Sequence, residues 1–110
     1  MLTYRGSVLL VKVKVYRRKN NMYTIRIPEI GTLRQNPANK RTHYLVGRII
    51  EYLREKYKVP VLESGDYEID EKELEAFIRA YIILKSSAPS EPLEELIRNV
   101  ENVFIRIKSL

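Results

Sequence analysis

Apolar and polar residues alternate in two segments near the N-terminus. In residues 8–16, three valines are separated by lysines, and in residues 23–27 a tyrosine and two isoleucines are separated by a threonine and an arginine. A period of two that is rich in β-branched residues is typical of a half-buried strand. Residues 17–22 between them include two asparagines, which tolerate the left-handed backbone of tight turns. The pattern therefore predicts an antiparallel β-hairpin.

The register of this hairpin follows from the parity of its apolar positions, which have odd numbers. A three-residue loop, residues 19–21, places Val15 opposite Ile25 and keeps both apolar sets on one face. A two-residue loop would place Val15 opposite Arg26 and mix the two faces. We therefore expect the three-residue loop, with Lys14 opposite Arg26 on the solvent face.

Two helices are predicted in the middle of the chain. In residues 36–57 apolar positions recur at helical spacing, and Asn36 followed by Pro37 is typical of an N-cap and a first helical residue. The next helix begins at a capping box formed by Asp70 and Glu73, and it ends shortly before a proline. We interpret the residues between the two helices as a turn-rich connection.

A third helical stripe begins near Leu93 and continues to the end of the chain. We favour a helix for this segment. Because residues 103–107 have strong β propensity, the alternative is that they add a third strand to the sheet of the hairpin. The stripe follows a heptad spacing for about two and a half repeats, which is short for a coiled coil. Packing within the chain is therefore favoured over a homodimer through the C-terminal helices.

The expected fold is a single α+β domain, residues 1–110, in which an N-terminal antiparallel β-hairpin packs against three α-helices. Hydrophobic residues make up 45% of the chain, which is enough for one core and too many for an intrinsically disordered chain. The expected core positions are Val11, Val13, Val15, Ile25, Ile27, Leu45, Ile49, Leu53, Phe77, Ile78, Tyr81, Leu96, Ile97 and Val100.

Charge divides the chain into a basic and an acidic half. Residues 1–60 contain 14 Lys and Arg against 3 Asp and Glu, a net charge of +11. Residues 61–110 contain 6 against 11, a net charge of −5, so that the whole chain carries +6. A basic half of this kind favours a polyanionic partner. We expect that partner to be DNA or RNA, bound mainly through its phosphates and without catalysis.

Basic residues are expected to gather first on the solvent face of the hairpin. Like charges on opposite strands destabilise a sheet, and bound phosphates would offset this. A basic two-stranded ribbon can enter a major groove or lie along a phosphate backbone. The alternative is a solvated face that uses lysine to block edge-to-edge pairing. The candidate nucleic-acid-binding residues on the hairpin are Lys12, Lys14, Tyr16, Arg18, Lys19 and Arg26, and the tyrosine is included because its ring could stack on a base.

A second basic group stands near the start of the first predicted helix. Its candidate nucleic-acid-binding residues are Arg34, Lys40 and Arg41. Cations in a first helical turn oppose the helix dipole, and a phosphate bound at the helix N-terminus would account for them. The alternative is a helix that starts later, near Thr42. We expect the two basic groups to converge on one docking surface.

Catalytic and metal-binding motifs are absent from the sequence. There is no cysteine, and the single histidine, His43, has no predicted partner for catalysis or metal binding. The acidic residues that follow Gly65 lack the glycine and the glutamate of a calcium loop. We therefore expect no enzyme activity and no cofactor. The weakest alternative is a metal-dependent nuclease that uses Asp66 and Asp70.

The composition also bears on location and source. No apolar run is long enough to cross a membrane and the first residues do not form a secretory signal, so a cytoplasmic protein without a membrane partner is expected. Glutamine occurs once and tryptophan never, whereas Lys, Arg, Glu and Ile are plentiful. This balance is typical of a thermophile-like composition.

One third of the chain, residues 23–57, slightly resembles the partial RNase-H-like domain of HicB-type antitoxins. The similarity lies in a strand, a Pro-Glu-Ile-Gly stretch ending at Gly31, and an amphipathic helix. In that family the stretch is one residue longer, and small residues stand where this chain has residues 36–41, so no family is assigned. The resemblance implies a protein-binding module. The alternative function is therefore a protein-interaction module, such as an inhibitor, an antitoxin-like factor or an assembly subunit, that docks its basic half on an acidic partner.

Overall fold

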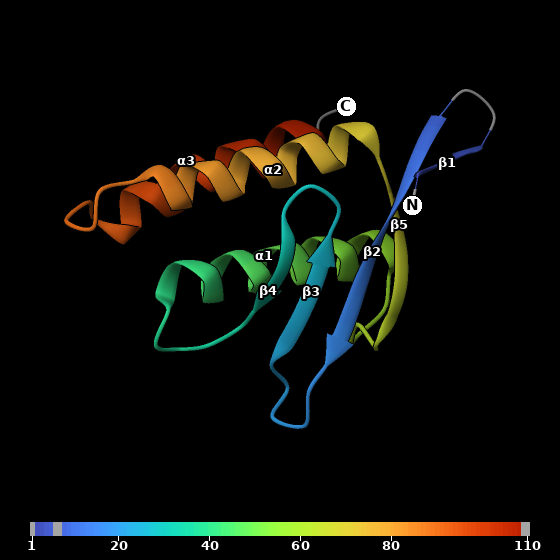
Figure 1. Cartoon of the computed structure of the whole chain (residues 1–110), viewed down its shortest axis with the longest axis horizontal. Helices are drawn as coiled ribbons and strands as arrows, with labels where there is room; N and C mark the ends of the chain where they lie inside the picture. The colour runs from blue at the N-terminus through green and yellow to red at the C-terminus, as the bar shows by residue number, and fades with distance from the viewer. Residues whose placement is uncertain (1, 6–7, 109–110) are drawn as a thin grey trace.

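Strands β2 (Val8–Arg17) and β3 (Tyr23–Ile27) form the predicted hairpin (Figure 1). Lys14 lies opposite Arg26, so the register is the predicted one. The connecting loop has the expected three residues, and Asn21 in it has a φ of 61°, the left-handed conformation that asparagine tolerates. Local turn chemistry and the parity of the apolar positions therefore determine this part of the fold.

The hairpin is the centre of a larger sheet than the sequence predicts. The computed structural model describes residues 2–5 and 8–108, and in this part of the chain five antiparallel strands form one sheet. Strand β4 (Gly31–Arg34) pairs with β3, whereas β1 (Leu2–Arg5) and β5 (Gly65–Asp70) pair with β2. Residues 14 and 15 of β2 pair with β5 on one side and with β3 on the other. Residues 10 and 11 of β2 pair with β5 on one side and with β1 on the other. Strand β5 therefore occupies one edge of β2, and β1 and β3 follow each other along the opposite edge.

The connection predicted between the first two helices is wrong in part, because residues 65–70 form β5. Acidic residues at positions 66, 68 and 70 alternate there with Tyr67 and Ile69. Ile69 is fully buried and Tyr67 is half-buried against the core. This segment therefore has the period-two alternation of a half-buried strand, although its polar positions are acidic.

Three helices follow the hairpin, α1 (Lys40–Tyr57), α2 (Glu71–Ser86) and α3 (Leu93–Lys108). The capping box at the start of α2 is confirmed. The carboxylate of Asp70 accepts a hydrogen bond from the Glu73 amide (2.8 Å), and the carboxylate of Glu73 accepts one from the Asp70 amide (2.8 Å). The C-terminal segment is helical, so the alternative of a strand there is wrong.

Helix α1 begins later than predicted. Asn36 closes a turn, in which its side chain accepts a hydrogen bond from the Ala38 amide (3.0 Å) and its carbonyl accepts one from the Asn39 amide (2.9 Å). The N-cap is Asn39, whose side chain accepts a hydrogen bond from the Thr42 amide (3.3 Å). Lys40 is therefore the first helical residue, between the two starting points that the sequence suggested.

The helices cover one face of the sheet, and the core lies between them. Helix α1 contacts β3 and β4, and α2 contacts β2 and β5. Alternate residues of these strands point toward the helices and are buried or half-buried. Helix α3 packs on the other two helices, where the ring of Phe104 lies against the rings of Tyr52 and Phe77. Among the described residues, no helix covers the opposite face of the sheet.

Eleven of the fourteen predicted core residues are buried, and Ile78, Tyr81 and Ile97 are half-buried. The core also contains nine residues that the sequence analysis did not include: Val46, Ile50, Tyr52, Leu62, Ile69, Leu74, Ala80, Leu84 and Phe104. Most of these additions widen a helical stripe that had been predicted, because helices packed on two sides bury a broader face than a simple amphipathic stripe.

Candidate nucleic-acid interface

The outer face of the sheet carries most of the predicted basic residues of the hairpin. Side chains of a strand alternate between its two sides, so the neighbours of the buried valines and isoleucines face outward. We call the exposed outward residues of β2, β3 and β4 the open face. They are Lys12, Lys14, Tyr16, Arg26, Thr32 and Arg34.

Lys14 and Arg26 lie directly opposite each other on adjacent strands of the open face. Like charges in this arrangement repel each other. No ion pair joins Lys12, Lys14 or Arg26 to an acidic side chain in the part of the chain that the structure describes. No direct ion pair among the described residues therefore neutralises these three cations.

The same three cations surround a hollow of about 470 Å³. The turn between β3 and β4 forms its other wall, with Pro28 and Ile30 as apolar lining and Glu29 as a single carboxylate. In this turn Glu29 has a φ of 71° and Gly31 a φ of 99°. Three cations against one carboxylate give the lining a net positive charge. The hollow therefore suits a phosphate that carries a planar or apolar neighbour.

Tyr16 is 50% exposed and stands two positions from Lys14 on the open face. Its cross-strand neighbour is Thr24, and Arg34 lies opposite Thr24 on the next strand. Arg26 is diagonal to the tyrosine, within reach of a long side chain. An exposed ring among cations offers a stacking surface for a base whose phosphate is bound beside it.

Strand β5 borders the open face with acidic residues. Asp66 lies opposite Lys14, and Glu68 lies opposite Lys12. The outer side of the sheet is thus basic on β2, β3 and β4 and acidic on β5. These acids were predicted to lie in a turn-rich connection, so the acidic border that limits the width of the basic surface was not predicted.

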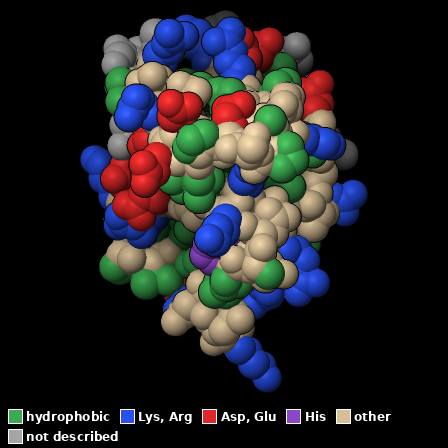
Figure 2. Space-filling model, turned by 90° about the vertical axis from the view of Figure 1, so that its left-hand side faces the viewer, with side chains coloured by type: hydrophobic (Ala, Val, Ile, Leu, Met, Phe, Trp, Pro, Cys, Tyr) green, Lys and Arg blue, Asp and Glu red, His purple; other side chains and the backbone are tan. Residues whose placement is uncertain are grey.

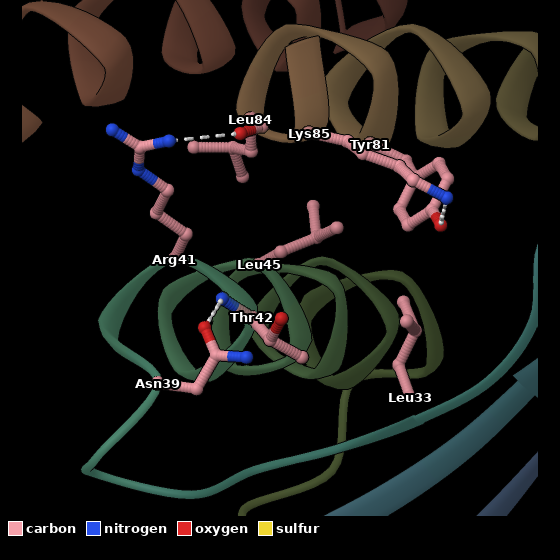
Figure 3. Close-up of a pocket in the computed structure, with 8 residues that line it drawn as sticks. All are labelled: Leu33, Asn39, Arg41, Thr42, Leu45, Tyr81, Leu84 and Lys85. Carbon is pink, nitrogen blue, oxygen red and sulfur yellow. Dashed lines mark hydrogen bonds between the residues drawn. The ribbon is translucent and has the colours of Figure 1, made fainter. Parts of the chain in front are cut away.

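Arg41 takes part in the packing of helices. Its guanidinium reaches from α1 to the end of α2 and donates a hydrogen bond to the carbonyl of Leu84 (3.5 Å) (Figure 3). It also donates hydrogen bonds to the carbonyls of Ser87 (3.2 Å) and Ala88 (2.7 Å). A helix C-terminus carries the negative end of the helix dipole. This contact explains a cation in the first turn of α1 without a bound phosphate. We therefore remove Arg41 from the candidate interface.

A smaller cavity of about 300 Å³ lies beside this contact, between the start of α1 and the end of α2 (Figure 3). Leu33, Leu45 and Leu84 form apolar parts of its wall. Lys85 also lines it, and its ammonium group donates a hydrogen bond to the hydroxyl of Tyr81 (2.9 Å). The cavity is largely apolar, so it does not have the chemistry of a phosphate site.

The other predicted basic residues lie apart from one another. Arg18 is half-buried and donates a hydrogen bond to the carbonyl of Gln35, which ties the hairpin to the end of β4. Lys19 is exposed at the tip of the hairpin. Lys40 is exposed in the first turn of α1, the helix that covers the inner face of the sheet. The two basic stretches of the sequence therefore do not form one continuous surface.

Figure 2 shows one end of the molecule, where Lys and Arg side chains form separate groups and several acidic side chains gather at one side. No continuous positive face is seen in this view. The net charge of the N-terminal half is thus spread over several parts of the surface. The candidate interface is local, and it consists of the open face with its hollow.

Two tyrosine–glutamate hydrogen bonds lie among the helices. Tyr52 donates to the buried carboxylate of Glu73, which also accepts a hydrogen bond from Lys56 (2.7 Å). Tyr44 donates to the carboxylate of Glu101. Burial and these hydrogen bonds raise the pKa of Tyr44 and Tyr52 above the ordinary range of tyrosine. Each glutamate is satisfied within the fold, so these clusters are structural.

Among the described residues, no group of three or more His, Asp or Glu side chains could hold a metal ion. In the same part of the chain, no helix combines the length and the apolar character that crossing a membrane requires. No family model, curated protein or solved structure matches this chain. A functional inference therefore depends on the geometry and charge of the open face.

Proposed function

We propose that the protein binds nucleic acid, without catalysis, through phosphate contacts on the open face of its sheet. The main support is that Lys12, Lys14 and Arg26 surround one hollow and form no ion pair with an acidic side chain among the described residues. Arg34 and Tyr16 extend the surface on the same side of the sheet. Rigid strands thus present four cations and one exposed ring together.

The position of these cations argues against the alternative role of blocking edge-to-edge pairing. Strand β2 pairs with β5 on one edge and with β3 on the other, and β3 pairs with β2 and β4. Lys14 and Arg26 therefore stand on central strands, where no open edge needs protection. Their repulsion costs a few tenths of a kcal/mol or more in the free sheet. A phosphate between them would replace that repulsion with charge-assisted hydrogen bonds.

Fluorescence anisotropy with labelled oligonucleotides over a series of salt concentrations tests the proposal. Four phosphate contacts predict that log K falls against log salt with a slope of about −2.8 for a single strand and about −3.6 for a duplex. The four contacts are those of Lys12, Lys14, Arg26 and Arg34. A slope near zero, or no binding at low salt, would overturn the proposal.

A pair of matched variants separates the open face from general electrostatic attraction. The double variant Lys14→Gln/Arg26→Gln should weaken binding strongly. The control Lys72→Gln/Arg98→Gln removes the same charge from exposed positions on α2 and α3 and should bind nearly as the parent protein does. An equal loss in both variants would contradict the proposal. Displacement of the oligonucleotide by polyglutamate at similar concentration would favour a protein-interaction module instead.

A further inference from the structure

We infer that the open face takes single-stranded nucleic acid and discriminates against duplexes, an inference that rests on the proposed function. The first reason is the width of the sheet. The row Asp66, Lys14, Arg26 and Thr32 crosses four adjacent strands. Strands are about 4.8 Å apart, so the outer two strands are separated by about 14 Å before side chains are added. A major groove is about 12 Å wide, so the hairpin cannot enter it as an isolated ribbon.

The second reason is the spacing of charge across the sheet. The cations that line the hollow belong to two adjacent strands, β2 and β3. The two backbones of a duplex are about 12 Å apart across the major groove, which is more than twice the spacing of adjacent strands. A second backbone on the β5 side would lie against Asp66 and Glu68. The cationic part of the open face is therefore wide enough for one phosphate backbone, and it is too narrow for the two backbones of a duplex.

The third reason is the exposed ring of Tyr16. A base that stacks on a side chain must first leave the stack of a duplex, whereas the bases of a single strand are accessible. The ring stands diagonal to Arg26 and on the same strand as Lys14. A strand whose phosphate lies between these two cations places one neighbouring base within reach of the ring. Another neighbouring part of the strand would reach the apolar wall of the hollow at Pro28 and Ile30.

Anisotropy titrations with one short sequence, as a single strand and as a duplex, in DNA and in RNA form, test this inference. The single strand should bind at least tenfold more tightly than the duplex. Tyr16→Ala should weaken single-strand binding about tenfold and leave duplex binding unchanged, because only an unpaired base can stack on the ring. Tyr16→Phe keeps the aromatic face and should bind like the parent protein. Urea denaturation of each variant checks that the fold is retained.

The acidic border gives an independent test. Asp66→Asn removes one charge beside Lys14 and should raise duplex affinity several-fold, with a smaller effect on the single strand. The matched control is Glu71→Gln, which removes an exposed charge in the first turn of α2. It should change neither affinity by more than the small effect of net charge.

The outcomes separate this inference from the function on which it rests. Failure to bind either form of the oligonucleotide would overturn the proposed function. Duplex binding as tight as single-strand binding would overturn the inference and leave the proposed function in place. The same holds if Tyr16→Ala binds single strands as well as Tyr16→Phe does, or if Asp66→Asn and Glu71→Gln change duplex affinity equally.

Discussion

The hydroxyl of Tyr57 donates a hydrogen bond to the carbonyl of Glu68 (2.7 Å) and accepts one from the amide of the same residue (2.9 Å). Glu68 lies in β5, a strand that pairs only with β2 in the described part of the sheet. Unpaired backbone groups on such an edge are a template for pairing with another chain. One side chain at the end of α1 thus satisfies both backbone groups of this residue.

Tyr57→Phe should therefore expose the backbone amide and carbonyl of Glu68 at the edge of β5. The ring contact with Tyr67, at 5.2 Å between centroids, is retained in the variant, so only the hydrogen bonds of the hydroxyl are lost. We expect a loss of about 1 kcal/mol in the free energy of unfolding by urea, and increased self-association in sedimentation experiments. Tyr16→Phe is the control. If both variants have the same stability and the same sedimentation behaviour, Tyr57 does not protect the edge.

Arg41 should matter for stability and not for nucleic-acid binding. Arg41→Gln removes the charged donor from the carbonyls at the end of α2 and should cost about 1–2 kcal/mol in the free energy of unfolding. Lys40→Gln, a neighbouring change of the same charge at an exposed position, should cost less than about 0.5 kcal/mol. Both variants should bind oligonucleotides equally well. A selective loss of binding in Arg41→Gln would return this residue to the interface.

Alkaline pH should destabilise the protein through Tyr44 and Tyr52. Burial and the hydrogen bonds to Glu101 and Glu73 raise the pKa of both phenols above the ordinary value of 10.0. A group with a raised pKa in the folded state contributes its full stabilisation below the unfolded pKa and loses it as the pH rises above that value. The free energy of unfolding should therefore decline above about pH 10. Each tyrosine contributes at most about 1.4 kcal/mol per pH unit, and less where solvent screens it.

Urea denaturation between about pH 9 and pH 11 measures this decline. Tyr52→Phe removes one of the two titrating hydroxyls, so its stability should fall less steeply with pH than that of the parent protein. Identical slopes in the variant and the parent protein would show that Tyr52 does not contribute to the alkaline transition.

The turn between β3 and β4 contains a backbone conformation that its residue disfavours. Glu29 has a φ of 71°, and the amide of Ile30 donates to the carbonyl of Ile27 (3.1 Å), as in a type II turn. Glycine is preferred at this position because it has no Cβ. Glu29→Gly should therefore raise the free energy of unfolding by about 0.5–1 kcal/mol. Thermal and urea denaturation measure the gain, and a loss of stability would contradict this account of the turn.

Local signals explain what could be predicted about the fold. The hairpin register depended only on the parity of its apolar residues, and the capping box at Asp70 involves residues three positions apart. The start of α1 was wrong because Asn36 and Asn39 are both good N-cap residues three positions apart. In the structure Asn39 is the N-cap, and a helix that begins at Lys40 has Arg41 in its first turn, where its guanidinium reaches the end of α2. No local pattern contains that information.

The boundary of the candidate site was not predictable for the same reason. Asp66 lies opposite Lys14 although more than fifty residues separate them in the chain. Residues 65–70 have the alternation of a strand, but six residues with acidic polar positions do not specify which strand they pair with. The basic centre of the open face could be predicted from the hairpin alone. Its acidic border could not be predicted, because it depends on the non-local pairing of β5 with β2.

Stability and binding should change in opposite directions at Arg26. Arg26→Glu replaces a like-charge pair with an attractive one, because the new carboxylate lies opposite Lys14. The free energy of unfolding should rise by roughly 0.2–1 kcal/mol, while oligonucleotide binding falls sharply. Arg34→Glu is the matched control. Its cross-strand neighbour is Thr24, so binding should fall without a gain in stability. Two outcomes would contradict a phosphate-binding role of the pair, namely intact binding by Arg26→Glu or equal changes of stability in the two variants.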